Sequence, residues 1–280
     1  MSSRSSGAAR SVYLASSREE LMRLVEELYK SVKPRKRGLD KPRFDTVTEL
    51  DKWVGPVPWH GRWLAASQHL ERLSYGRRLG FGLLLLYGLQ GSGKTVLSLI
   101  VAHELLAMRG RRYPMKRIID EYLVFHPDEL REKVRHASAR RRVPVLIGDD
   151  WGITGSGTNW FEDREFYLYL RKLMQVVRTR IANMIVTAAD VEAVARMIRG
   201  QPGAVIGLVR SVNKEYSVAT YYELGVLPTG YKYVRKIGED VFYVMMPDEI
   251  YGYYLERRDR YVDYVLDTGK RRLIPPGSPY

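Results

Sequence analysis

The sequence predicts an α/β fold of three layers, in which helices cover both faces of a mainly parallel five-stranded sheet. The run 81–87 is continuously apolar, as expected of a strand buried on both faces. Four further apolar runs follow it, at 122–126, 143–150, 183–188 and 204–212. Segments of helical periodicity separate these runs, and such alternation is typical of a parallel sheet.

The helices expected between these strands occupy residues 94–108, 127–137, 164–180 and 190–200. Pro127 suits the first turn of its helix, and Gly200 ends the last helix. In the third helix one face collects the apolar side chains of Phe166, Leu170, Leu173, Met174 and Val177. The periodicity therefore supplies a helix for each crossover between parallel strands.

The segments outside this core differ from it in composition. We expect a flexible basic N-terminal extension with one helix (1–43), disordered as far as residue 17, and then a core spanning 44–211 that opens with a helix at 61–75. A strand-rich addition with a terminal helix (212–266) precedes a disordered basic tail (267–280). Within the addition, short strands are predicted at 216–224, 231–238 and 240–246, with turns at 228–230 and 238–240 and the helix from 248.

Composition excludes several kinds of protein. The chain has 280 residues, 45% of them hydrophobic, which is enough for a sizeable core. It has no cysteine, and therefore no disulfide, thiolate metal site or cysteine nucleophile. No apolar run approaches the roughly 18 residues of a membrane span, and the N-terminus has no signal-peptide pattern, so a cytoplasmic protein is predicted. Scarce asparagine with abundant arginine and tyrosine suits a thermophilic source.

The charge of the chain points to a polyanionic partner. Lysine and arginine number 46 against 32 acidic residues, a net charge of +14. Nucleic acid is the first candidate partner and an anionic membrane the second. The basic segment 33–43 is either a contact to the phosphate backbone or a solvated hinge.

The segment 88–95, GLQGSGKT, matches the pattern G-x-x-x-x-G-K-[ST] and lies between a predicted strand and a predicted helix. Glycines let the backbone adopt positive φ and bring its N–H groups to phosphates, and the helix N-terminus favours the same charge. Lys94 would reach the β- and γ-phosphates of ATP, and the Thr95 hydroxyl would ligate Mg²⁺. The predicted nucleotide-binding residues are Gly88, Gln90, Gly91, Ser92, Gly93, Lys94, Thr95 and Val96.

Two acidic residues end the third predicted strand, where a metal-binding carboxylate belongs. We expect Asp149 to bind Mg²⁺ with Thr95, and Asp150 to activate the attacking water. Alternatively, Asp150 only caps the turn into Trp151. Thr187 ends the fourth strand, where its hydroxyl would contact the γ-phosphate or the water; the other interpretation is a helix cap. The paired acids favour hydrolysis of ATP by water.

With these motifs in place, the chain resembles P-loop ATPases of the ASCE division, which have a strand between the phosphate-loop strand and the metal-binding strand. More narrowly, GLQGSGKT and DDWG (149–152) resemble AAA+ helicase loaders and initiators of the DnaC, IstB and DnaA type. The chain departs from loaders at Ala188 and Ala189, where an asparagine is usual, and it has no recognisable helical lid. The segment 195–222 is equally similar to ATPases of the FtsK/HerA type and to phage assembly ATPases.

The resemblance implies an oligomer in which a neighbouring subunit supplies an arginine to the γ-phosphate. The candidates are Arg178, Arg180, Arg196 and Arg199, with Arg199 preferred. The segment 152–164 is a switch, a nucleic-acid contact or a plain connection.

Three functions remain open at this point. The first is an Mg²⁺-dependent ATPase acting on DNA as a homo-oligomer, like loaders and initiators, with another replication, transfer or packaging protein as a further partner. The second is a DNA-translocating or packaging motor. The third is an ATP-binding scaffold or switch that is not a motor.

Overall fold

The computed structural model describes residues 12–15, 63–76, 80–151, 172, 175, 177–189, 203–227 and 232–268, without the side chains of 12–15, 127, 128, 232 and 264–268. The predicted N-terminal helix, the helix at 190–200, most of the helix at 164–180, the loop 152–164, the segment 33–43, the turn at 228–230 and the end of the basic tail lie outside the described residues.

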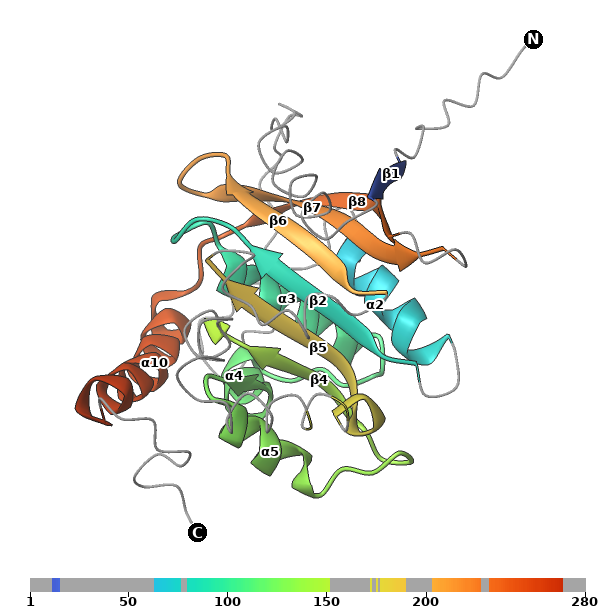
Figure 1. Cartoon of the computed structure of the whole chain (residues 1–280). Coiled ribbons are helices and arrows are strands. Elements are labelled where there is room, and N and C mark those ends of the chain that lie inside the picture. The colour runs from blue at the N-terminus through green and yellow to red at the C-terminus, as the bar shows by residue number, and fades with distance from the viewer. Residues whose placement is uncertain are drawn as a thin grey trace.

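The described elements form an α/β fold, as predicted (Figure 1). The strands are β1 (Val12–Ala15), β2 (Gly82–Tyr87), β3 (Leu123–Val124), β4 (Val143–Gly148), β5 (Ile181–Ala188), β6 (Val205–Ser211), β7 (Tyr216–Val226) and β8 (Lys232–Tyr243). The helices are α2 (Ala65–Tyr75), α3 (Lys94–Ala107), α4 (Met115–Tyr122), α5 (Pro127–Arg135) and α10 (Asp248–Thr268).

All eight strands belong to one mixed sheet, in the order β1-β8-β7-β6-β2-β5-β4-β3. Five adjacent strands, in the order β6-β2-β5-β4-β3, pair in parallel. Strand β7 pairs antiparallel with β6, β8 with β7, and β1 with β8. The strand β5 lies between β2, which precedes the glycine-rich loop, and β4, which precedes the paired acids. The carboxyl ends of β2, β4 and β5 therefore share one edge of the sheet, here called the phosphate edge, and their starts share the opposite edge.

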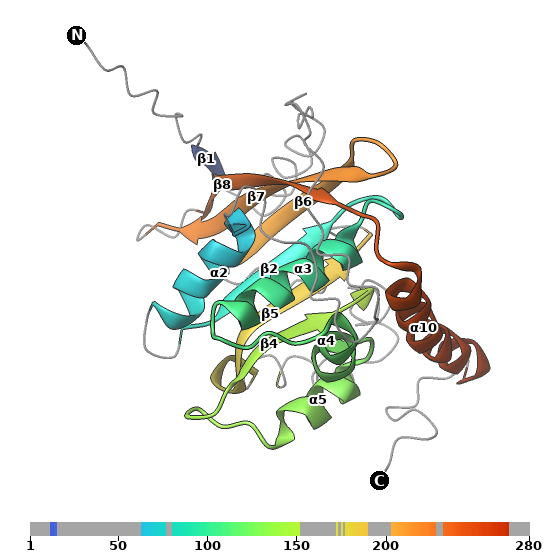
Figure 2. The ribbon, with the colours of Figure 1, turned by 180° about the vertical axis from the view of Figure 1, so that it is seen from behind.

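The core is built on the parallel strands. Every residue of β2 and of β5 is buried, because both strands are central and lie in mainly apolar surroundings. Helices α2 and α3 pack side by side against one face of the sheet (Figure 2). No helix among the described residues is both long and apolar enough to cross a membrane.

The N-terminal extension contributes a strand, so the expected disorder of residues 1–17 does not hold for residues 12–15. Residues 12–15 form β1, which pairs antiparallel with β8 and places Val12 opposite Arg235. Without β1, the outer side of β8 would carry unpaired N–H and C=O groups, and such an edge readily accepts another strand. The composition of the extension gave no sign of this long-range pairing.

The predicted turn at 238–240 is wrong, because β8 runs through it as one strand with a bulge. Tyr221 pairs with Gly238, whereas the next residue of β7 pairs with Lys236. The carboxylate of Asp240 caps α2 by accepting hydrogen bonds from the N–H groups of Ala65 at 2.9 Å and Ala66 at 3.3 Å. A Cβ on Gly238 would lie 2.8 Å from the Cβ of Ala65, so the glycine permits the helix to approach. The turn-like residues therefore serve a helix terminus.

The predicted strand at 122–126 is shorter than expected, and a helix precedes it. Strand β3 has two residues, and α4 ends at Tyr122. Helix α4 was not predicted, although its buried residues follow a helical spacing: Met115, Ile118, Ile119 and Tyr122.

A buried acid between α2 and α3 makes stability depend on pH. Glu104 of α3 is 2% exposed and accepts a hydrogen bond from the N–H of Leu64 at 3.0 Å. Burial raises the pKa of its carboxyl to about 7, and that hydrogen bond opposes the rise. Because the folded pKa exceeds the unfolded value, the folded state loses stability as pH rises from about 4.5 to about 7, by about 3 kcal/mol in all.

Glu104→Gln is therefore expected to stabilise the protein by up to about 3 kcal/mol near pH 8 and to have little effect near pH 4.5. Glutamine keeps an oxygen that can accept from Leu64. Urea unfolding at both pH values measures the difference, with the exposed Glu215→Gln as the control. An effect of equal size at both pH values would contradict the burial argument.

Candidate nucleotide-binding site

The glycine-rich loop joins β2 to α3 at the phosphate edge. Gly91 and Gly93 have φ of 77° and 88°, values that favour glycine, and α3 begins directly after Gly93. A Cβ on Gly88 would lie 2.3 Å from the carbonyl oxygen of Val209, so β6 leaves room for glycine alone at the start of the loop. The loop thus presents the N-terminus of a 14-residue helix, a favourable position for an anion.

Lys94 turns its side chain back over this loop. Its ammonium donates to the carbonyl oxygens of Gly88 at 2.8 Å and Leu89 at 3.0 Å, and the residue is 9% exposed. Burial lowers the pKa of Lys94 below its ordinary value, and the charges of Asp150 and Asp149 oppose that fall. The loop therefore carries a positive charge that is held in a defined place and poorly solvated.

Thr95 and Asp149, 54 positions apart in sequence, meet at the phosphate edge. The Thr95 hydroxyl donates to the Asp149 carboxylate at 3.0 Å. Two more hydroxyls reach the same carboxylate, that of Thr187 at 2.6 Å and that of Tyr254 at 2.7 Å. Asp149 is thus an acceptor for side chains from α3, β5 and α10, which fix its orientation.

The carboxylate of Asp149 lies in an unfavourable place for an anion. The residue is 1% exposed, and burial raises the pKa of its carboxyl, while the hydrogen bonds from Thr187, Tyr254 and Thr95 oppose the rise. Burial also raises the pKa of Tyr254, so its hydroxyl keeps the proton that it donates. A divalent cation would supply the charge that a buried carboxylate lacks.

Asp150 stands in a turn that its neighbours impose. Its φ is 55°, an uncommon value outside glycine that aspartate tolerates better than most residues. The next residue, Trp151, is 1% exposed and packs on Gly148, where a Cβ would lie 2.6 Å from the indole ring. The carboxylate of Asp150 pairs with Arg258 at 2.8 Å. The alternative interpretation, in which Asp150 only caps the turn into Trp151, does not account for this ion pair with an arginine of α10.

Thr187 lies beside both acids. It donates to Asp149 and accepts a hydrogen bond from the N–H of Asp150 at 2.9 Å. A threonine hydroxyl has a single proton, and here that proton is directed at the carboxylate. The contact of Thr187 with the γ-phosphate or the attacking water stays a prediction.

Of the four arginines predicted to reach the γ-phosphate bound by a neighbouring subunit, two are described by the structure and two are not. Arg196 and the preferred Arg199 lie outside the described residues. Arg178 is exposed, and Arg180 donates to the carbonyl oxygens of Val134, Arg135 and Ala137. Both precede β5 and therefore lie at the opposite edge, away from the glycine-rich loop of their own chain.

Two residues of this candidate site, Tyr254 and Arg258, were not predicted. The helix that carries them was predicted, and their separation by four places puts them on one helical face. Nothing local in the sequence indicates where that helix docks.

The residues present suit Mg²⁺ better than a softer metal. Thr95 and Asp149 offer oxygen ligands, and Mg²⁺ binds through one or two carboxylates together with substrate phosphates. The described residues contain no cluster of three histidine, aspartate or glutamate side chains that would hold a metal by themselves. Within the loop, the buried Ser92 hydroxyl has no hydrogen-bond partner among the described residues, and Gln90 and Gly91 are exposed. Thr95 and Asp149 alone would leave coordination positions of Mg²⁺ open, and phosphate oxygens of a bound ligand would fill them.

Comparisons with known proteins find relatives of unassigned function. The chain is 25% identical over 213 residues to the uncharacterized protein B-251 of Sulfolobus spindle-shape virus 1, covering 70% of this chain and 84% of that protein. It is 27% identical over 160 residues to the uncharacterized protein ORF286 of Acidianus two-tailed virus, covering 56% of this chain and 54% of that protein, about half its length. A solved structure, the KaiC-like protein PH0186 from Pyrococcus horikoshii OT3, matches 57% of this chain and 93% of its own at 16% identity, with a TM-score of 0.32. No protein-family model matches the chain.

Proposed function

We propose that this chain is a Mg²⁺-dependent ATPase that acts on DNA as an oligomer, in the manner of helicase loaders and replication initiators. The observation that carries the proposal is the meeting of Thr95 and Asp149 beside the phosphate loop, with a 3.0 Å hydrogen bond between them. The Thr95 hydroxyl lies at the start of α3, and the buried Asp149 carboxylate follows β4, which is separated from β2 by one strand. Such a pair suits a metal ion that is bound to phosphate.

Each residue of the site has a role in this proposal. Loop N–H groups and Lys94 would bind the phosphates, and Thr95 and Asp149 would hold Mg²⁺, which would supply positive charge to the phosphate oxygens. Asp150 accepts a proton from the attacking water. Its carboxylate lies on the same edge of the sheet and is only partly buried, so water can reach it.

The DNA part of the proposal is supported by arginines at the opposite edge. There Arg142 donates to the carbonyl oxygen of Ile181 at 2.6 Å and to that of Gly80, tying together the starts of three parallel strands. Around it the loops after α3 and before β4 carry the exposed side chains of Arg111, Arg112, Arg140 and Arg141. The chain as a whole has a net charge of +14, and the exposed arginines at this edge suit contacts to a phosphate backbone.

A second candidate, a DNA-translocating or packaging motor, is favoured by two observations. The strands β7 and β8 continue the core sheet where a loader would have a helical lid. Both relatives found by sequence are viral proteins.

The test measures ATP turnover with and without Mg²⁺, together with molecular mass by light scattering, in the presence of single-stranded or duplex DNA. DNA-stimulated turnover by an oligomer supports the proposal, and strict dependence on duplex DNA supports the motor. A monomer that binds ATP with negligible turnover would overturn both in favour of a switch.

Arg111→Gln with Arg112→Gln is expected to weaken DNA binding uniformly across sequences. If both side chains contact phosphates, the slope of log affinity against log salt concentration falls by about two. Fluorescence anisotropy with labelled DNA over a salt series measures it. The control removes two charges elsewhere, with Lys214→Gln and Arg260→Gln, both exposed. Equal losses in the two double variants would mean that only net charge matters, and that the opposite edge is not the DNA site.

A further inference from the structure

The C-terminal helix α10 lies at the phosphate edge of the sheet, where β8, the strand before it, ends. After β8 the chain passes the phosphate loop, where a Cβ on Gly93 would lie 2.6 Å from a methyl group of Val244. Helix α10 then lies beside the ends at which the arrows of β2, β4 and β5 point (Figures 1 and 2). The last helix of the described chain therefore covers the place where the nucleotide site is assembled.

Two side chains on one face of α10 engage both acids of that site. The hydroxyl of Tyr254, which is 5% exposed, donates to Oδ2 of Asp149 at 2.7 Å. One turn later, the guanidinium of Arg258 donates to Oδ2 of Asp150 at 2.8 Å. These contacts join residues 105 and 108 positions apart, so they depend on how the helix docks.

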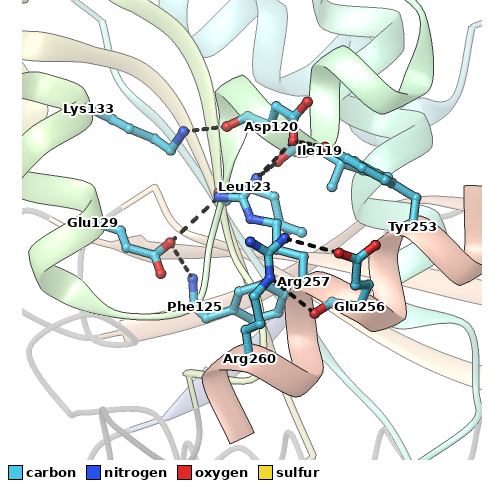
Figure 3. A network of polar contacts seen from close by, with 10 residues as sticks. All are labelled: Ile119, Asp120, Leu123, Phe125, Glu129, Lys133, Tyr253, Glu256, Arg257 and Arg260. Atoms are coloured by element: carbon cyan, nitrogen blue, oxygen red, sulfur yellow. Dashed lines mark hydrogen bonds and ion pairs between the residues drawn. The ribbon is translucent and has the colours of Figure 1, made fainter. Parts of the chain in front are cut away.

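A separate set of contacts anchors α10 without involving the site (Figure 3). Arg257 donates to the carbonyl oxygens of Ile119 and Leu123, and its guanidinium lies 3.7 Å from a carboxylate oxygen of Asp120 and 3.8 Å from one of Glu129. Tyr253 also donates to Asp120. The helix can therefore stay attached to α4 and β3 while its contacts to Asp149 and Asp150 are broken.

Both site contacts oppose the chemistry that the acids would perform. Asp149 accepts from three hydroxyls, which leaves few lone pairs for a metal or a metal-bound water. Oδ2 of Asp150 is already occupied by the guanidinium of Arg258 at 2.8 Å, which a water molecule would have to displace to reach that oxygen. The acids are thus engaged with α10 in an arrangement unsuited to hydrolysis.

We propose that α10 is a latch on the nucleotide site: Tyr254 and Arg258 hold the two carboxylates, and binding of Mg²⁺ with ATP competes with these contacts and releases that face of the helix. The inference rests on the proposed ATPase function and adds a regulatory element to it. The position of α10 would then differ between the nucleotide-free and the nucleotide-bound state, and a neighbouring subunit that contacts α10 could detect this difference.

The first test is the affinity for a fluorescent ATP analogue, measured with Mg²⁺ and with EDTA. Tyr254→Phe removes one hydrogen bond to a charged group, and we expect it to tighten binding in Mg²⁺ about tenfold while leaving binding in EDTA nearly unchanged. Tyr253→Phe is the matched control, because it removes a hydroxyl from the same helix that points to Asp120. Weaker or unchanged binding of Tyr254→Phe in Mg²⁺ would overturn the latch.

The second test needs no variant. Hydrogen exchange of the α10 amides is expected to speed up when the unaltered protein binds Mg²⁺ and ATP, but not with ATP in EDTA. Greater protection of α10 in Mg²⁺ and ATP would show that the helix closes on the nucleotide instead, and would overturn the proposal. If the unaltered protein binds no nucleotide at all, the proposed function fails as well; binding with unchanged α10 exchange defeats the latch alone.

Discussion

Lys94→Ala is expected to lower ATP turnover by about 10²- to 10³-fold, the loss typical of removing one preorganised group that stabilises charge in a transition state. The ammonium of Lys94 is held over the loop by the carbonyl oxygens of Gly88 and Leu89. Because it is nearly buried, its charge acts through a medium that screens it less than water does. Among the described residues, no other lysine or arginine donates to these loop carbonyls.

Phosphate release at saturating ATP measures the effect, and binding of a fluorescent ATP analogue shows whether affinity falls with it. Lys214→Ala, an exposed change in the turn between β6 and β7, is the control for the lost charge. Lys94→Arg should not restore turnover, because a planar guanidinium cannot replace a compact ammonium between two carbonyl groups. Near-normal turnover in Lys94→Ala with an unchanged melting temperature would remove this residue from the mechanism.

The glycine-rich loop could be predicted from local signals in the sequence, and the position of the acids from the expected parallel topology of the sheet. The apolar run before Gly88 fixes a buried strand, and the loop glycines fix the backbone that the helix needs. The position of Asp149 and Asp150 follows from parallel topology, since the ends of parallel strands meet at one edge.

The docking of α10 could not be predicted in this way. The helix has tyrosines and arginines on several faces, so its periodicity does not tell which face is buried. The choice depends on tertiary partners, such as the backbone carbonyl of Leu123 that accepts from Arg257. The same holds for Asp240. Residues 238–240 were predicted as a turn, but Asp240 caps α2 at Ala65, which is far away in the sequence.

Asp149→Asn and Asp150→Asn are expected to separate metal binding from proton transfer. Asp149→Asn keeps the size of the side chain but removes the charge that would hold Mg²⁺, so the gain in nucleotide affinity on adding Mg²⁺ should disappear. Turnover should fall by about 10³-fold or more, since a bound metal contributes several kcal/mol to the stabilisation of transition-state charge.

Asp150→Asn should keep the gain in nucleotide affinity on adding Mg²⁺, and should increase it by weakening the contact to Arg258, because the Asp150 side chain contacts Arg258 and not the Asp149 cluster. Its turnover should still fall by about 10²- to 10⁴-fold, as expected when a general base is removed. Nucleotide binding in Mg²⁺ and in EDTA is measured for both variants and compared with their turnover. The control for folding is Asn213→Asp, which exchanges asparagine for aspartate at an exposed position. If both acids change binding and turnover alike, the division of roles between them is wrong, and Asp150 acts on the metal together with Asp149.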